Sequence, residues 1–293
     1  MGFSSLDDLI SEITSGKFNR QDWQKSTGAN GFAVGRWYDF GAAAGFPVAN
    51  AFAGTALAWR TCDEATGNGT QIYGMPHGGL VTPDTKHVLN TMALSAVATA
   101  VPGVLMFVDL QGYWPGIQTN TVAVQALTGI PALRYANGAG CRLYTVCTTG
   151  TGASAQNIAL SYTDQGGVAG NTLPITVAMT ASAVPTHIHH SGTAANNYGP
   201  FLPLASGDSG VQNVASVTMS GANTPGTFAL CLARPLFQIP ISIAGVAAER
   251  DLVNQLPSLP RVMDGACVVP LFFAGAATAA NTPIMGAVEL GWG

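Results

Sequence analysis

The 293-residue chain has few charged side chains. Only 9% of its residues are Asp, Glu, Lys or Arg, whereas an ordinary soluble domain has about 25%. A chain of this length buries about three quarters of its surface on folding, so a large core is possible. The remaining surface is then too poor in charge for a monomer that lives alone in water. We infer that other subunits cover much of the folded surface.

Basic residues are also scarce, and they do not cluster. The 11 lysines and arginines are outnumbered by 15 acidic residues, which gives a net charge of −4. Proteins that bind nucleic acid through the phosphate backbone gather lysine and arginine in a patch. The sequence therefore predicts no nucleic acid partner.

No long apolar run predicts a helix that crosses a membrane. The best candidate, residues 91–108, is interrupted by Ser95, Pro102 and Gly103. The first charged residue of the chain is the acidic Asp7, whereas a secretory signal begins with a basic region. We expect no membrane partner.

The five cysteines are odd in number and include no C-x-x-C pair. Cys141 and Cys147 belong to one expected strand, in which their Cα atoms would be about 20 Å apart. A disulfide spans at most about 7 Å between Cα atoms. These spacings predict buried free thiols and a protein made in a reducing compartment.

Residues 4–17 predict an amphipathic helix close to the N-terminus. Ser4 or Ser5 is expected to cap its start, and Gly16 to end it. A helix of this length is marginally stable alone, so its apolar stripe must dock on the chain's own body or on another subunit. The side chains of that stripe, which we expect to anchor the helix, are Leu6, Leu9, Ile10 and Ile13.

The rest of the chain consists of short β-like runs separated by turn residues, which predicts an all-β fold. We expect a β-sandwich or jelly-roll body at residues 31–293 and a helical arm at residues 1–30, divided by a shift in composition. One helix is expected late, at residues 248–256. The predicted strands are residues 86–95, 104–111, 141–148, 157–163, 172–180, 211–220, 227–234, 236–243, 267–274 and 283–290.

Three stretches contain no charged residue at all: residues 165–207, 209–233 and 265–288. Each is too long to be a single buried strand, so its turns and outward faces must consist of Gly, Ala, Thr, Ser and Asn. Such surfaces suit close contact between subunits better than contact with bulk water. The C-terminal half is therefore where we expect most contacts in an assembly.

One tetrapeptide points toward catalysis. Residues 207–210 read GDSG, as around the nucleophile of chymotrypsin-like proteases, and His77 or His87, Asp109 and Ser209 follow that family's order. The motif also makes an ordinary turn, because Asp and Ser bond locally and Gly allows positive φ. We favour the turn and no catalytic residue, and a serine hydrolase that uses Ser209 remains an alternative.

A second cluster contains histidines that could bind metal or line an interface. On a strand, His187 and His189 would point to the same face about 7 Å apart, which suits two ligands of one ion. The sequence supplies no third ligand nearby, so partners would have to come from symmetry mates. We favour histidines at a surface or an interface, and no metal.

Cofactor motifs are missing as well. The Gly-rich stretches lack dinucleotide spacing, and no Gly-Lys-Ser or Gly-Lys-Thr occurs. Acidic residues are too sparse to suggest a carboxylate pair for glycoside hydrolysis. We expect no cofactor and no enzymatic activity.

Four segments resemble recurring blocks of a family of structural proteins in the virions of tailed bacteriophages. They are VLMFVDLQGYWPG (104–116), LRYANGAGCR (133–142), SYTDQGGVAG (161–170) and NQLPSLP (254–260). The resemblance implies a β-rich virion protein, most plausibly a capsid decoration or cement protein on the head. It carries no catalytic or ligand-binding role with it.

This resemblance implies the major capsid protein and copies of the chain itself as partners, as a trimer or dimer on the capsid surface. Assembly would take place in the cytoplasm of the bacterial host. Within such contacts we expect Arg134 and Arg142 as ion partners, because arginine is the cation favoured at buried interfaces. A tail or receptor-binding protein is the first alternative.

Overall fold

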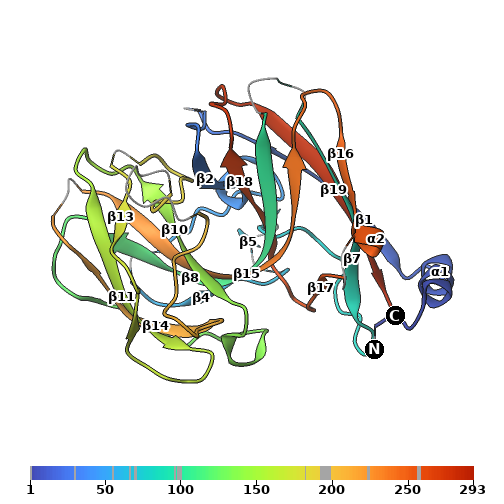
Figure 1. Cartoon of the computed structure of the whole chain (residues 1–293), viewed down its shortest axis with the longest axis horizontal. Coiled ribbons are helices and arrows are strands. Elements are labelled where there is room, and N and C mark those ends of the chain that lie inside the picture. Colours follow the sequence, from blue (N-terminus) through green and yellow to red (C-terminus); the bar gives the residue numbers. More distant parts are fainter. Residues whose placement is uncertain are drawn as a thin grey trace.

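Three antiparallel β-sheets make up most of the computed structural model (Figure 1). The structure describes the whole chain except residues 1, 30, 55, 66, 69–70, 96, 98–100, 182, 192–198, 223–224 and 256–258. None of the described helices is long and apolar enough to cross a lipid bilayer.

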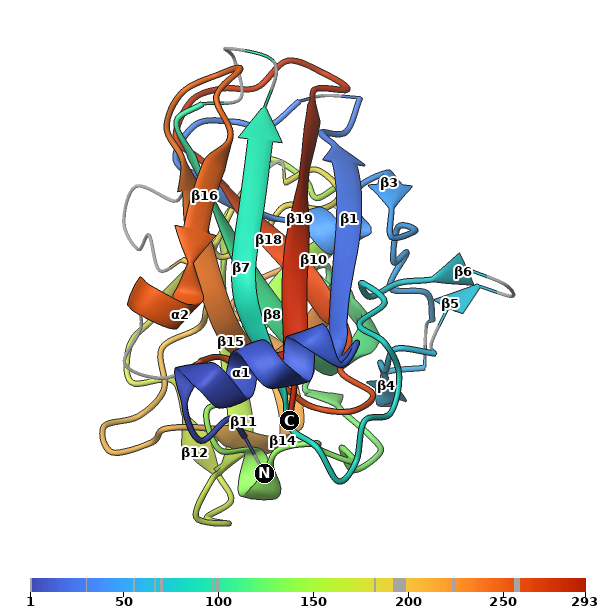
Figure 2. The same ribbon diagram turned by 90° about the vertical axis from the view of Figure 1, so that its right-hand side faces the viewer.

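The first sheet has the strand order β16-β7-β19-β1-β3, with β17 beside β7. The α1 helix crosses the lower end of its outer face (Figure 2). The elements of this part are α1 (Leu6–Thr14), β1 (Phe18–Ser26), β3 (Gly45–Phe46), β7 (Lys86–Ser95), β16 (Ala248–Asp251), α2 (Leu252–Gln255), β17 (Arg261–Val262) and β19 (Pro283–Trp292).

The central sheet has the order β10-β15-β8-β18-β2, with β4 beside β8. Its strands are β2 (Arg36–Asp39), β4 (Arg60–Thr61), β8 (Gly103–Gln118), β10 (Arg142–Thr149), β15 (Thr227–Ile241) and β18 (Val268–Ala274). A 3-10 turn, η1 (Phe40–Ala42), follows β2.

The third sheet has the order β12-β11-β14-β9, with β13 beside β11. Its strands are β9 (Gln125–Ala126), β11 (Gln156–Asp164), β12 (Asn171–Thr172), β13 (Val177–Met179) and β14 (Val211–Met219). A small hairpin of β5 (Gly67–Asn68) and β6 (Gln71–Ile72) and a 3-10 turn, η3 (Ala136–Gly138), complete the described elements.

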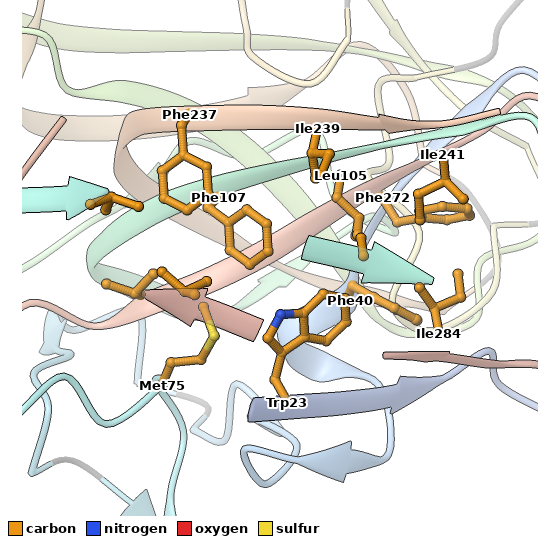
Figure 3. Packing of buried hydrophobic residues seen from close by; sticks show 14 of the residues in the cluster. Trp23, Phe40, Met75, Leu105, Phe107, Phe237, Ile239, Ile241, Phe272 and Ile284 are labelled. Carbon is orange, nitrogen blue, oxygen red and sulfur yellow. The ribbon is translucent and has the colours of Figure 1, made fainter. Parts of the chain in front are cut away.

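The central sheet packs against both other sheets, so the predicted all-β sandwich is confirmed. Strands β8 and β15 are long enough to reach both partners (Figure 1). The first half of β8 packs on the first sheet, where Phe107 stacks on Phe237 at 4.6 Å and meets the edge of Trp23 (Figure 3). The second half packs on the third sheet through Trp114 and Ile117.

Strand β15 is buried on both faces along its first half. Phe228, Leu230 and Leu232 point toward the third sheet. Ala229 and Cys231 point to the opposite face, where β10 and β18 contribute further apolar side chains. This two-sided burial explains the uncharged run in β15 without any contact to another subunit.

The boundary of the N-terminal segment differs from the prediction. The expected arm ended at residue 30, which itself lies outside the described residues. The structure instead places β1 inside the first sheet, where it pairs with β19 from Phe18↔Gly291 to Ser26↔Pro283. Of the expected arm, the described residues before Phe18 precede the first strand.

The late helix is mostly wrong. Residues 248–251 form β16, which pairs with β7, and only Leu252–Gln255 are helical. Leu256, the last residue of the predicted helix, lies outside the described residues. Pairing with the edge of the first sheet therefore overrides the helical propensity of this stretch.

Candidate interaction surfaces

The α1 helix has two apolar rows, and only one of them contacts the body. Ser5 caps the helix, and its side chain accepts a hydrogen bond from the backbone amide of Asp8 at 3.1 Å. Leu9 is buried, with 6% of its surface exposed, whereas Leu6 is 61% and Ile10 54% exposed. Ile13 is half-buried beside Leu9 on the inner row.

Ion pairs also hold the helix on the body of the chain. Lys17, just after α1, makes ion pairs of 2.9 Å with both Glu12 and Asp84. Of the four predicted anchors, Leu9 therefore docks the helix on its own chain. Contact with another subunit stays a prediction, and the exposed row of Leu6 and Ile10 is the part of the helix that is free to make it.

An apolar hollow of about 450 Å³ lies on the outer face of the first sheet. The α1 helix crosses only the lower end of this sheet (Figure 2). The strand register brings Met285 between Leu94 and Gln24, and Gln24 pairs in turn with Phe46. Arg20, ion-paired to Asp22 and Glu289, forms a polar border. The apolar lining residues of the hollow are Trp23, Phe46, Met92, Ala93, Leu94, Ala247 and Met285.

The outer face of the third sheet carries small uncharged side chains. In the register of β11 and β14, Ala159 faces Thr218 and Ser161 faces Ser216. These four residues are half-buried or exposed, and their inward neighbours are buried. Here the uncharged sequence does correspond to an uncharged surface, as the composition predicted.

Most of the exposed large apolar side chains of the described chain lie in four segments. One is the outer row of α1, and the others are the chain around β9, the region around β12 and the turn between β15 and β16. Scattered apolar residues are normal on a protein surface, but gathered ones mark contact sites. The members of the last three segments are Val122, Val124, Ile130, Val168, Ile175, Ile243 and Val246.

Arg134 makes an ion pair inside the chain instead of projecting toward a neighbour. Its Nη2 and Nε donate to the two carboxylate oxygens of Asp109, and Nη1 donates to the Cys62 carbonyl at 2.6 Å. The Asp109 side chain is fully buried and also accepts from the Cys267 amide at 3.0 Å. The guanidinium thus compensates a buried charge of its own fold.

Arg142 makes no ion pair among the described residues. Its Nη2 donates to the Leu202 carbonyl at 3.3 Å, and its guanidinium lies 5.9 Å from the centre of the Phe201 ring. Burial lowers the pKa of Arg142 from its usual value. Its role as an ion partner between subunits stays a prediction.

The predicted histidine cluster lies inside the chain. His187 and His189 are only 0% and 2% exposed, so neither side chain is on the surface. They are also not on one strand, because His187 forms an isolated bridge to Tyr38 and His189 lies in a turn. The expected position at a surface or an interface is therefore wrong.

Burial also keeps these imidazoles neutral. It lowers the pKa of His187 to about 3, of His189 to about 4 and of the adjacent His190 to about 3. His190 bonds to the Thr145 hydroxyl and the Pro200 carbonyl. No group of three potential metal ligands occurs among the described residues.

The residues of the expected catalytic triad have other partners. Ser209 is exposed, and its backbone amide donates a hydrogen bond to Oε1 of Gln165 at 2.9 Å. His77 contacts the Ala266 carbonyl at 2.8 Å, and the Asp109 carboxylate binds Arg134. No described hydrogen bond joins Ser209 to a histidine, so the geometry favours the predicted turn.

A buried lysine was missed by the sequence reasoning. Lys25 of β1 is fully buried, and its ammonium donates to the carbonyls of Gly41, Ala43 and Pro47. It thereby ties β1 to the chain that leads from η1 past β3. Only tertiary contacts reveal this role, because no local pattern distinguishes Lys25 from a surface lysine.

No protein-family model matches the sequence, and no curated protein matches it. Among solved structures, infectious bursal disease virus, Gt strain, aligns with 11% identity and a TM-score of 0.19 over 94% of this chain and 80% of that one. A mutant VP2 protein of that virus in T=1 particles aligns with 10% identity and a TM-score of 0.18, over 94% and 77%. Likeness at this level supports no argument about function.

Proposed function

We propose that the chain is a non-enzymatic structural protein of a virion, and more specifically a capsid decoration protein of a tailed bacteriophage. The observation that carries the proposal is that most exposed large apolar side chains lie in four segments of a chain with 9% charged residues. The sequence blocks that resemble phage virion proteins support the same conclusion.

The surfaces match the task of a protein that covers joints in a shell. Contact at many equivalent sites allows modest affinities to combine. The outer row of α1 offers apolar contact area, and the face of β11 and β14 offers uncharged contact area without isolated charges that would need partners.

A co-sedimentation experiment tests the proposal. Phage shells that lack the chain are mixed with the purified chain, and with a Leu6→Asp, Ile10→Asp variant. The wild type is expected to bind shells saturably, and the variant at least about 10-fold more weakly, since two charges would be buried. A Leu80→Asp variant is the control, because Leu80 is exposed outside the four segments.

Two results would oppose the proposal in different ways. Failure of the wild type to bind shells, together with binding to purified tails, would favour the tail protein. Hydrolase labelling of the wild type that a Ser209→Ala variant loses would favour the enzyme.

A further inference from the structure

A hollow of about 610 Å³ opens where the chain around η3 meets β15 and β17. Unlike the linings of the surfaces described above, its lining is rich in arginine. Its lining residues are Arg134, Tyr135, Ala136, Ala139, Arg234, Pro235, Leu236, Leu259, Pro260, Arg261 and Met263.

The charges in this hollow are unbalanced. No acidic residue lines it, and of its three arginines only Arg134 is compensated, by Asp109 behind it. Neither Arg234 nor Arg261 makes an ion pair among the described residues. Two uncompensated arginines therefore line one hollow in a chain that has only 11 basic residues.

Arg234 is held in place before any ligand arrives. Its guanidinium lies 4.2 Å from the centre of the Tyr135 ring, and Nη1 donates to the Ala139 carbonyl at 3.2 Å. The remaining donors of the group have no acceptor among the described residues.

We propose that this hollow binds an oxyanion, a carboxylate or a phosphate, between Arg234 and Arg261. Guanidinium groups match the planar geometry of such anions and bind them with two parallel hydrogen bonds. An orientation fixed by Tyr135 and Ala139 reduces the entropy that binding costs. The apolar walls of Leu236, Leu259 and Met263 accommodate the body that carries the anionic group.

Calorimetric titration at constant ionic strength tests the site with citrate and with pyrophosphate. We expect both probes to bind the wild type, and binding to be at least about 10-fold weaker in Arg234→Gln and in Arg261→Gln, because each loses charge-assisted hydrogen bonds. Arg60→Gln is the control, since it makes the same change in net charge on β4, outside the hollow.

The source of the anion is resolved with a short peptide that carries one glutamate among apolar residues. Binding of the peptide, with displacement by citrate, assigns the site to a carboxylate of a neighbouring protein chain. Binding of citrate or pyrophosphate without the peptide assigns it to a free anion. The proposal is overturned if no probe binds below about 10 mM, or if Arg60→Gln weakens binding as much as Arg234→Gln. It does not depend on the proposed function.

Discussion

Buried polar side chains are the residues whose roles depend most on the folded structure. Lys25 and Asp39 are both buried, and burial lowers the pKa of Lys25 to about 8 and raises the pKa of Asp39 to about 6. Asp39 is bonded by the Tyr144 hydroxyl at 2.9 Å. The sequence reveals neither the burial of Lys25 nor the hydrogen bond between Asp39 and Tyr144, because the residues that meet in the fold lie far apart along the chain.

Arg134 and Arg142 were predicted together, and the structure separates them. Replacing Arg134 by Gln leaves the Asp109 carboxylate buried without its countercharge, so we expect a loss of about 3–5 kcal/mol in the free energy of unfolding. Arg142→Gln, the matched control, should cost about 1 kcal/mol or less, because it breaks no ion pair. Urea unfolding of the isolated chain measures both. Equal, small effects would contradict the intrachain role of Arg134.

The buried histidines predict a loss of stability in acid. The pKa values of His187, His189 and His190 lie below the ordinary 6.5, so the unfolded chain binds more protons and stability falls as the pH drops from about 6.5 to about 4. Asp39 has the opposite effect on stability. Its pKa is raised from 3.8 to about 6, so at this site the folded chain binds more protons than the unfolded chain as the pH drops.

We expect the free energy of unfolding to fall by about 4 kcal/mol from pH 7 to pH 5, at about 1.4 kcal/mol per pH unit for each net proton. Urea titrations across this range measure it. In a His189→Leu variant, the free energy of unfolding should depend on pH less steeply, by about one proton, because one titrating imidazole is removed. The substitution breaks no hydrogen bond of the ring, since neither ring nitrogen of His189 has a partner among the described residues. An unchanged slope in that variant would contradict the account.

At the scale of single elements, the sequence pattern located the long strands except β1, and it missed the short strands β2 to β6, β9, β16 and β17. The inward positions of β1 include Asn19, Gln21 and Lys25 beside Trp23, so no apolar pattern marks it. Strand β15 was predicted as two strands, at residues 227–234 and 236–243. The structure continues it through a bulge near Pro235, a residue type that normally ends a strand.

The α1 helix provides a test of which row docks on the body. Leu9→Ala should destabilise the isolated chain by about 2 kcal/mol, because it empties a buried position. The double variant Leu6→Ala, Ile10→Ala should leave its melting temperature within about 1 °C, since both side chains are exposed. Thermal melts decide between the rows, and a larger loss from the double variant would reverse the assignment.

On the scale of the whole molecule, the central sheet makes two sandwiches interdependent. Strands β8 and β15 contribute to the core against the first sheet and to the core against the third. Neither outer sheet can separate without exposing the shared strands. This arrangement could not be predicted from residues 104–111 and 227–234, because strand patterns do not reveal which sheets a strand joins.

Shared strands predict one cooperative unfolding transition. Phe107→Ala lies in the core against the first sheet and Leu160→Ala in the core against the third. Each should lower the melting temperature of the whole chain without splitting the transition, at a cost of about 3–4 kcal/mol. Scanning calorimetry that resolves two transitions in either variant would show independent sandwiches.

The shortage of charge has two origins in the folded molecule. In β15 and β18 it follows from burial inside the chain, whereas on the outer face of β11 and β14 it belongs to the surface. Only the uncharged outer face of β11 and β14 is a surface that supports contact with other subunits. The sequence alone could not separate them, because an uncharged run looks the same in both settings.

Electron microscopy of intact virions, labelled with an antibody raised against this chain, tests the central claim most directly. The account predicts label at regular intervals on the capsid surface, and loss of that label from particles made without the chain. Label absent from every part of the particle, with the chain recovered only in the host lysate, would contradict a structural role in the virion.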